Sequence, residues 1–496
     1  MTRLLSYFSP LLIILIFASS CVVQESPITG TKRAYAYSWD QEIQIGREVD
    51  SEIVSEFGLY EDDQINEWFD RISHEILENS HMRGEDVSDR FRNTEFVFRV
   101  LDSPVINAFA LPGGYVYVTR GLLAHMNNEA QLAVVIGHEI GHVAARHASQ
   151  RGLQQTIGSV IVMGGAILGQ ELLGLPGGSI LNLSGQAAQL IFLSYSRNHE
   201  RESDRLGVEY AAKTGYAAEE GAAFFTSLRR ISERSGQALP NLLSTHPDPG
   251  EREQNIPRKA AEWREQGYEQ TIYKTEEYLQ RLQGMIYGDN PRNGFHEDGN
   301  FYHPDLEFRF PYPTGWQVIN QPSQVVLVSG EGDAVMILRL DQESSDARES
   351  VHKFLEMNNI ESSDQRSTTS SGSIPAYEAN FSIQDGEQTL GVNVYALEYG
   401  GRVYRYINYT TQNLFDQYRE HFAATTSQFS RLTDQRILNT RPVTINLVET
   451  TQRSRFSDLL PSPMPMNIDP EEVAIINQVF LDDMIEPGTT LKIPTQ

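Results

Sequence analysis

The chain has 496 residues, which is too long for a single hydrophobic core, because such cores stop growing at about 250 to 300 residues. Hydrophobic residues make up 40% and charged residues 21%, which excludes a largely disordered chain. The formal net charge of -26 excludes sequence-independent binding of nucleic acid, which needs clustered lysine and arginine. We therefore expect about two to four folded domains and no nucleic-acid partner.

Residues 1–20 have the pattern of a signal peptide for export. Arg3 gives a positive start, residues 11–17 are apolar, and small residues come directly before Cys21. The apolar run is shorter than the roughly 20 residues that a membrane-spanning helix needs. Export is therefore the stronger interpretation, and a permanent transmembrane anchor the weaker one.

Cys21 is the only cysteine of the chain, so it cannot form an intramolecular disulfide. Its position after the small residues resembles a bacterial lipobox, which implies a lipid anchor on Cys21. Val22 stands where an aspartate would retain a lipoprotein at the inner membrane, and this implies the outer membrane. Cleavage to a soluble secreted protein is the alternative.

The next segments predict a tether, two helices and a small group of strands. Residues 21–38 contain the Ser, Thr, Pro and Gly typical of a tether, and residues 39–79 carry apolar positions at helical spacing. Runs of β-branched and aromatic residues at 96–100, 108–111 and 115–119 predict strands around a Pro-Gly-Gly turn.

The middle of the chain is predominantly helical. Residues 129–155 repeat apolar positions three or four apart without proline and predict one long helix. The Gly-rich, apolar stretch 157–193 fits buried core helices, with a hydrophobic lid or a membrane-facing edge as the alternative. Helical patterns return over 199–234 and 258–287, and residues 288–300 have the composition of a linker.

Two further modules follow the linker. Alternating strand and helix patterns over 301–433 predict an α+β domain without a histidine cluster, phosphate loop or nucleophile motif, so its role is open. Residues 440–496 predict strand, helix, helix and strand. Their ending, Ile485 to Pro494, resembles the LysM peptidoglycan-binding module, although Thr450-Thr451-Gln452 replaces the usual Gly-Asp-Thr.

The motif His138-Glu139-Ile140-Gly141-His142 lies in the long helix expected at 129–155. Residues four apart share a helical face, so His138 and His142 can direct imidazole nitrogens to one ion, with Glu139 beside it. Zinc with about three protein ligands keeps a position for water, lowers the pKa of that water towards about 7 and polarises a carbonyl. We expect one Zn2+ per chain, with Glu139 as the general base.

A third metal ligand is expected from the helix that begins near Ser196, because its acidic residues would complete a His2Glu site. With this second motif, residues 39–286 resemble the HtpX, BepA and CAAX prenyl protease group of gluzincin peptidases. The family sequence Glu-x-x-Ala-Asp aligns with Glu200, Ser203 and Asp204. The resemblance implies Glu200 as zinc ligand and Asp204 as the carboxylate behind a zinc-bound histidine. An exposed helix acid is the alternative for Asp204.

The family's Ser-Thr-His-Pro stretch is present at 244–247, and Arg252 follows at the family spacing. The resemblance places His246 and Arg252 at the catalytic cleft, where either could stabilise an oxyanion. In the BepA-like branch, the equivalent histidine can instead occupy the water position on zinc. A third interpretation is that His246 merely caps a helix.

Three other positions have weaker assignments. Residues 107–114 match a family segment in which an edge strand binds an extended peptide, which implies substrate contacts for Asn107 and Ala108. His147 continues the family pattern, but its position five residues after His142 places it off the ligand face, so we expect a structural role. Tyr195 fits the aromatic core better than a substrate contact.

These patterns predict an α+β protein. A mainly helical, zincin-type metallopeptidase domain with a small sheet is expected at 39–287, then an α+β domain at 301–433 and a βααβ LysM-like module at 440–496. The resemblance implies an endopeptidase of the bacterial envelope, on the periplasmic side, that cleaves misfolded or misassembled proteins. The alternative is an assembly factor or chaperone with a largely latent zinc site, and peptidoglycan binding by the LysM-like end is a third interpretation.

Overall fold

The computed structural model describes residues 21–159, 195–235, 242, 245–246, 249–385, 388–465 and 468–496. The predicted signal peptide and most of the apolar stretch 157–193 lie outside these ranges, as do Ser244 and Pro247. Among the described residues, no helix combines the length and the apolar character needed to cross a bilayer.

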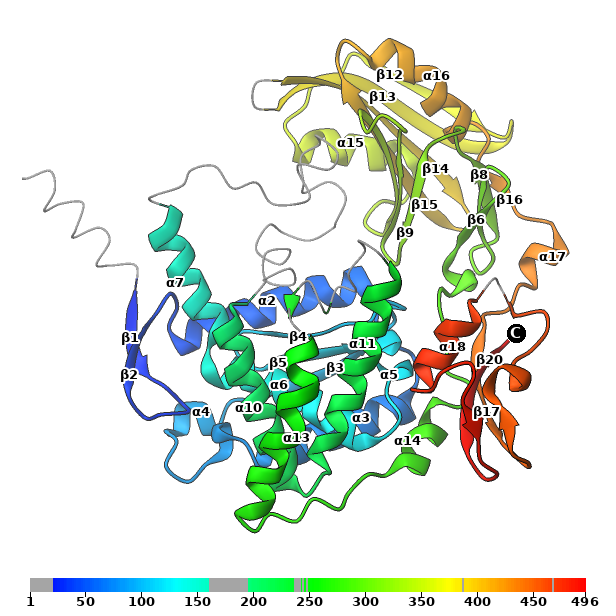
Figure 1. The fold of residues 1–496 in the computed structure, drawn as a ribbon. Helices are drawn as coiled ribbons and strands as arrows, with labels where there is room; N and C mark the ends of the chain where they lie inside the picture. The colour runs from blue at the N-terminus through cyan, green and yellow to red at the C-terminus, as the bar shows by residue number, and fades with distance from the viewer. Residues whose placement is uncertain are drawn as a thin grey trace, which may run out of the picture.

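A three-stranded sheet enclosed by helices forms the part of the chain expected as a peptidase domain, named the peptidase part below (Figure 1). The strand order is β3 (Val97–Leu101), β5 (Tyr115–Thr119) and β4 (Ala108–Leu111), with β3 parallel and β4 antiparallel to β5. Alternate side chains point to opposite faces of a strand, so this sheet has two apolar faces. One packs on α2 (Trp39–Phe57) and the other on α6 (Glu129–Ala145).

The remaining helices pack around this layer, and all of them except α7 contribute side chains to one hydrophobic core with it. The pattern at 258–287, expected as one helix, is divided because the chain turns at Gly267 before entering the second helix. The remaining helices of this part are α3 (Asp63–Glu78), α4 (Asp89–Arg92), α5 (Arg120–Ala124), α7 (His147–Ser159), α10 (Arg197–Thr214), α11 (Gly221–Ser235), α13 (Pro249–Glu265) and α14 (Thr275–Leu282), with 3-10 turns η1 (His81–Arg83) and η2 (Ala218–Glu220).

Two predictions for this part are wrong in detail. The segment expected as a tether contains an antiparallel hairpin of β1 (Val22–Glu25) and β2 (Lys32–Tyr35), and its Ser, Thr, Pro and Gly residues form the turn. The long helix expected at 129–155 breaks at Arg146, which adopts a left-handed conformation with φ of 60°. No proline or glycine marks this break, so periodicity alone misses it.

The second part is a seven-stranded antiparallel sheet with one helix on each face. α16 (Phe415–Thr426) and a four-stranded sheet cover one face, and α15 (Ala347–Met357) covers the other. The expected linker at 288–300 already contains structure, namely η3 (Pro291–Asn293) and β6 (Phe295–Glu297). The other strands are β7 (Asn300–His303), β8 (Phe308–Pro311), β9 (Gln317–Gln321), β10 (Gln324–Val328), β11 (Ala334–Asp341), β12 (Asp364–Ser370), β13 (Ile374–Asp385), β14 (Gln388–Tyr399), β15 (Arg402–Thr411) and β16 (Ser430–Arg431).

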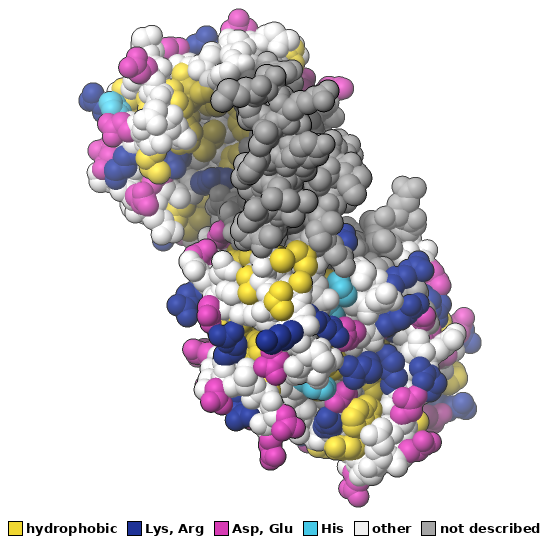
Figure 2. Space-filling model, turned by 90° about the vertical axis from the view of Figure 1, so that its left-hand side faces the viewer, with side chains coloured by type: hydrophobic (Ala, Val, Ile, Leu, Met, Phe, Trp, Pro, Cys, Tyr) yellow, Lys and Arg dark blue, Asp and Glu magenta, His cyan; other side chains and the backbone are white. Residues whose placement is uncertain are grey.

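Charged side chains are distributed without a large single-sign field on the face that Figure 2 shows. Over the peptidase part, in the lower half of that view, basic and acidic side chains are interspersed. The acidic excess of the chain is therefore not gathered into one region on this face.

The C-terminal module packs directly against the peptidase part. Its strands β17 (Thr444–Glu449) and β20 (Thr490–Thr495) pair antiparallel, and α18 (Pro470–Ile476) lies between them in the chain. The first of the two expected helices is only a 3-10 turn, η4 (Phe456–Leu459). The short helix α17 (Gln435–Leu438) leads into the module, and the short strands β18 (Ser454–Arg455) and β19 (Met484–Ile485) complete it.

A buried lysine joins this module to the helices that precede the histidine motif. Lys492 is fully buried, and its Nζ donates to the backbone carbonyls of Ala124 and Met126, each at 2.7 Å. Ile445, Val473 and Leu491, among other apolar side chains of the module, belong to the same hydrophobic core as the peptidase helices. The module is thus part of the peptidase core.

His125, which lies beside this contact, should make the free energy of unfolding fall as the pH becomes acidic. Burial lowers its pKa to about 4, and its Nδ1 donates to Gly121 O at 2.7 Å. The unfolded chain binds this proton near pH 6.5, so the stability from neutral His125 is complete above about pH 6.5 and is lost as pH falls towards 4. We expect the wild type to lose about 2 kcal/mol more than His125→Leu between about pH 7 and 4.5.

Urea unfolding followed by tryptophan fluorescence at both pH values measures this difference. Equal acid-dependent losses in the two proteins would contradict the assignment of the effect to His125.

Candidate metal centre

The two histidines of the motif lie on α6, a helix buried along its whole length. Asn128 caps its first turn by accepting from the Gln131 N–H at 2.9 Å. α6 crosses α10 at Gly137 and Gly207, where a Cβ added to Gly207 would lie 2.7 Å from the Val134 carbonyl oxygen. Only glycine allows this backbone approach, which brings the acidic side of α10 onto the histidine face of α6.

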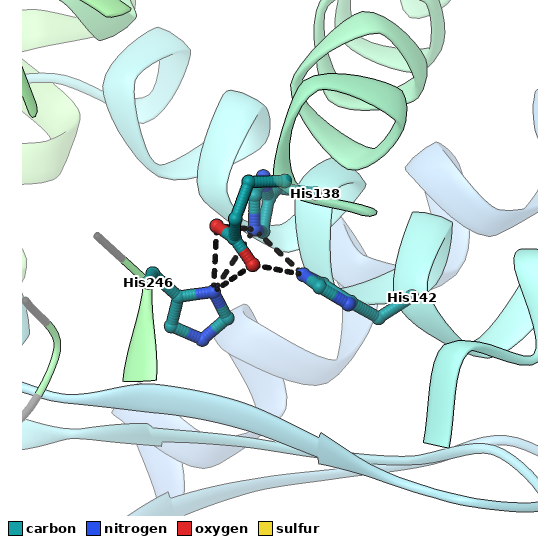
Figure 3. Close-up of side chains that lie close together, drawn as sticks. His138, His142 and His246 are labelled. Carbon is teal, nitrogen blue, oxygen red and sulfur yellow. Dashed lines mark hydrogen bonds and ion pairs between the residues drawn. The ribbon is translucent and has the colours of Figure 1, made fainter. Parts of the chain in front are cut away.

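Three side chains from these helices converge on one point. His138 Nε2 lies 2.9 Å from His142 Nε2, and the carboxylate oxygens of Glu200 lie 3.6 and 3.5 Å from these two nitrogens. With His246, the four donor atoms all lie within 4.8 Å of one another (Figure 3). Zinc binds imidazole nitrogens and carboxylate oxygens in proteins, so this set of donors fits a divalent metal such as zinc.

His246 reaches the same point from a separate segment. Its Nδ1 lies 3.3 Å from His138 Nε2 and 3.1 Å from the nearer oxygen of Glu200. Burial opposes a charge on this ring, but the carboxylates of Glu200 and Glu139 raise the pKa of His246 above its ordinary value. His246 therefore occupies the place of a fourth ligand, and the helix-cap interpretation does not account for its contacts.

Glu139 is buried beside the cluster and outside the set of converging donors. Its Oε1 lies 3.8 Å from His246 Nε2, and its Oε2 has no hydrogen-bond partner among the described residues. Burial raises the pKa of Glu139 above its ordinary value. A buried carboxylate with a free oxygen beside a metal site is placed to accept a proton.

A buried arginine connects the carboxylates of α10. The guanidinium of Arg252 contacts Glu200 Oε2 and donates from Nε to Asp204 Oδ2 at 3.1 Å. Asp204 Oδ1 in turn lies 2.9 Å from His138 Nδ1. Burial alone would raise the pKa values of both acids, but Arg252 and His138 lower that of Asp204 to about 2. Likewise, His246, His138 and Arg252 lower the pKa of Glu200 to about 2.

These contacts change the assignment of Arg252. Its side chain is 4% exposed and its guanidinium contacts two carboxylates, so it orients Glu200 and Asp204 rather than presenting a free donor to an oxyanion. The alternative of an exposed acid is wrong for Asp204, because its side chain is buried between Arg252 and His138.

His147 lies outside the set of converging donors, as its spacing predicted, but the sequence did not indicate its contact with His142. Its Nδ1 lies 3.1 Å from His142 Nδ1, because the break at Arg146 turns α7 back towards the motif. Tyr195 is buried with its ring centroid 4.1 Å from that of His142, as expected for an aromatic packing role.

The proposed substrate contacts lie at an edge of the sheet. Ala108 begins β4, which pairs with β5 on one side and with no strand of the described chain on its other side. Asn107 is buried, and its Oδ1 has no hydrogen-bond partner among the described residues. β4 packs against α6, so a strand edge that is unpaired within the described ranges adjoins the helix of the candidate metal cluster.

Comparison with known proteins agrees with this arrangement. Residues 64–260 match Peptidase family M48. The putative beta-barrel assembly-enhancing protease of Vibrio cholerae is 32% identical over 232 residues, which cover 46% of this chain and 46% of that protein. The mitochondrial metalloendopeptidase OMA1 of Arabidopsis thaliana is 34% identical over 148 residues, 30% of this chain and 28% of that protein.

The chain thus spans about half the length of the bacterial relative that it matches, and less of the plant one. The solution structure of PsbP from the cyanobacterium Synechocystis matches 27% of this chain and 91% of that protein, with 15% identity and a TM-score of 0.23, which carries no functional argument. The family M48 match and the named relatives support a metalloendopeptidase.

Arg252→Gln tests the role of the arginine behind the metal site. Loss of the guanidinium leaves Glu200 and Asp204 buried without their shared cation, so both acids are less available as anions. We expect zinc affinity to fall by about tenfold or more in a chelator competition. Arg201→Gln is the matched control, because Arg201 pairs with Glu251 at 3.1 Å on the exposed side of α10. Equal zinc affinity in both variants would contradict the role.

Proposed function

We propose that the chain is a zinc-dependent endopeptidase of the bacterial envelope. The observation that supports this most directly is the convergence of His138, His142 and Glu200 beside the buried base Glu139. It occurs within the segment that matches family M48. One Zn2+ per chain, held by these three ligands, is part of the proposal.

The chemistry follows from the residues that surround the metal position. Zinc bound there would lower the pKa of a water molecule and polarise the substrate carbonyl. Glu139 accepts the proton of the attacking water and passes it to the leaving amine, which a raised pKa favours. Arg252 and Asp204 hold Glu200 and His138 in orientation. The edge of β4 that no described strand occupies, from Ala108 onward, pairs with the substrate main chain in an extended conformation.

His246 makes the resting site a latent one in this proposal. Its Nδ1 approaches both His138 and Glu200, so it takes the position that water or substrate would need. Activity then requires the segment around His246 to move away, as substrate binding would cause. The same contact favours the rival class, an assembly factor whose zinc site stays closed.

Substrates and location form the next part of the proposal. Relatives named beta-barrel assembly-enhancing protease support a role in envelope protein assembly. Misfolded or misassembled envelope proteins are the substrates that we propose, reached from the periplasmic side of the outer membrane. Peptidoglycan binding by residues 440–496 stays a prediction from the LysM resemblance.

The test of the enzyme proposal compares purified wild type, Glu139→Gln and His246→Ala by metal analysis and casein cleavage. We expect about one zinc per chain, loss of cleavage by a factor of at least about 100 in Glu139→Gln, and faster cleavage in His246→Ala. His74→Ala is the control, because His74 lies on α3 with 43% of its side chain exposed.

Absence of zinc from the wild type would overturn the metal site. Zinc without cleavage in both the wild type and His246→Ala would favour the assembly factor. Slower cleavage in His246→Ala than in the wild type would give His246 a catalytic role in place of an inhibitory one.

Cys21→Ser tests the lipid anchor. Cys21 precedes β1 directly and is partly exposed, so the hairpin can hold the peptidase part next to a lipid. We expect the wild type in the membrane fraction and labelled by a fatty-acid analogue, and the variant unlabelled and soluble. Membrane association of the unlabelled variant would contradict anchoring through Cys21.

A further inference from the structure

The two histidine ligands of the proposed metal site are supported from behind in different ways. His138 Nδ1 faces the carboxylate of Asp204 directly. Behind His142 lies a second histidine, His147, whose ring is fully buried, with its Nδ1 at 3.1 Å from His142 Nδ1. The other nitrogen of this ring, Nε2, lies 3.3 Å from Glu202 Oε2.

The positions of the protons follow from this geometry. His142 Nε2 faces the other donors, so its lone pair serves the metal and the ring carries its proton on Nδ1. That proton is donated to His147 Nδ1, which must therefore hold a lone pair. A neutral His147 then carries its own proton on Nε2 and donates it to Glu202. Each nitrogen along the line has one defined role.

We propose that His147 and Glu202 are positioning residues that set the tautomer and ring orientation of His142 for metal binding. This inference rests on the proposed zinc site and adds to it two residues outside the ligand set. Partners behind a ligating histidine fix its ring and raise its basicity. His147 supports the ring of His142 in the way that Asp204 supports that of His138. Glu202 in turn accepts a hydrogen bond from His147.

Neighbouring groups hold the ring of His147 in place. His199 stacks on it, with ring centroids 4.3 Å apart and an interplanar angle of 18°. Ser203 Oγ lies 3.3 Å from His147 Nδ1, and can donate to the same lone pair. Glu202 is 29% exposed, so the carboxylate end of this line reaches solvent while His147 does not.

The turn that makes the contact possible is held by the N-terminal hairpin and by the start of α2. On a continuous helix, a residue five positions after His142 would lie about 140° around the axis from it. The left-handed conformation of Arg146 ends α6 and begins α7 at His147. The Arg146 guanidinium donates to Glu42 Oε1 at 2.6 Å and to Tyr37 O at 2.7 Å, and lies 3.7 Å from the centre of the Tyr35 ring.

The test exchanges His147 for residues that remove or retain the acceptor. His147→Leu fills the space without a lone pair, whereas the Oδ1 of His147→Asn takes the position of Nδ1. We expect His147→Leu to weaken zinc binding by about 10- to 100-fold in a chelator competition, and His147→Asn to restore most of it. The absorption spectrum of the Co2+-loaded protein should change in His147→Leu and resemble the wild type in His147→Asn.

Two further variants keep the test decisive. Glu202→Ala removes only the outer carboxylate, which is partly exposed, and we expect about tenfold weaker zinc binding with a folded protein. His125→Leu removes a buried, hydrogen-bonded histidine away from the cluster, so it controls for the cost of losing such a ring. Its zinc affinity should match the wild type.

The outcomes separate this inference from the proposed function. A wild type without zinc would overturn the metal site itself. If the wild type binds zinc and His147→Leu binds it with the same affinity, the positioning role alone is overturned. The same holds if His147→Leu and His147→Asn lose zinc affinity equally. If His147→Leu does not fold, unchanged zinc affinity in Glu202→Ala overturns it.

Discussion

The crossing of α6 and α10 is the constraint on which the rest of the site depends. Gly137 and Gly207 let the two backbones approach so closely that a side chain at Gly207 would meet Val134 O and His138 N. This approach places Glu200 and Asp204 opposite His138 and His142. A methyl group at either glycine would separate the helices and move the carboxylate away from the imidazoles.

Bringing these groups together confines many charges in a buried volume. Such groups are costly to bury unless each has a partner. Arginines lie beside the buried carboxylates. Arg252 lies between Glu200 and Asp204, and Arg146 pairs with Glu42 at the end of the motif helix. Among the described residues, the converging donors form the one group of side chains that could hold a metal ion, and a bound cation would offset the negative charge of Glu200 and order the donor atoms.

The other parts of the chain bear on this centre in different ways. The C-terminal module shares the peptidase core and inserts Lys492 between carbonyls at the start of the motif helix. The N-terminal hairpin holds the end of the same helix through Arg146. Both ends of α6 are thus secured by segments distant in the sequence, whereas the seven-stranded sheet has its own two cores.

The sequence by itself predicted the two histidines and the glutamate of the motif, because a His-Glu-x-x-His spacing depends only on helical periodicity and residue type, and the family resemblance added Glu200 and Asp204. It also indicated the α+β content and the order of the parts. It did not determine the break at Arg146 or the role of His147, because a left-handed residue without glycine leaves no local pattern and its stability comes from Glu42 and Tyr37, about a hundred residues away. Nor did it show that Arg252 faces two carboxylates. Those relations depend on which buried charges the packed helices bring within contact, and only the tertiary structure decided that.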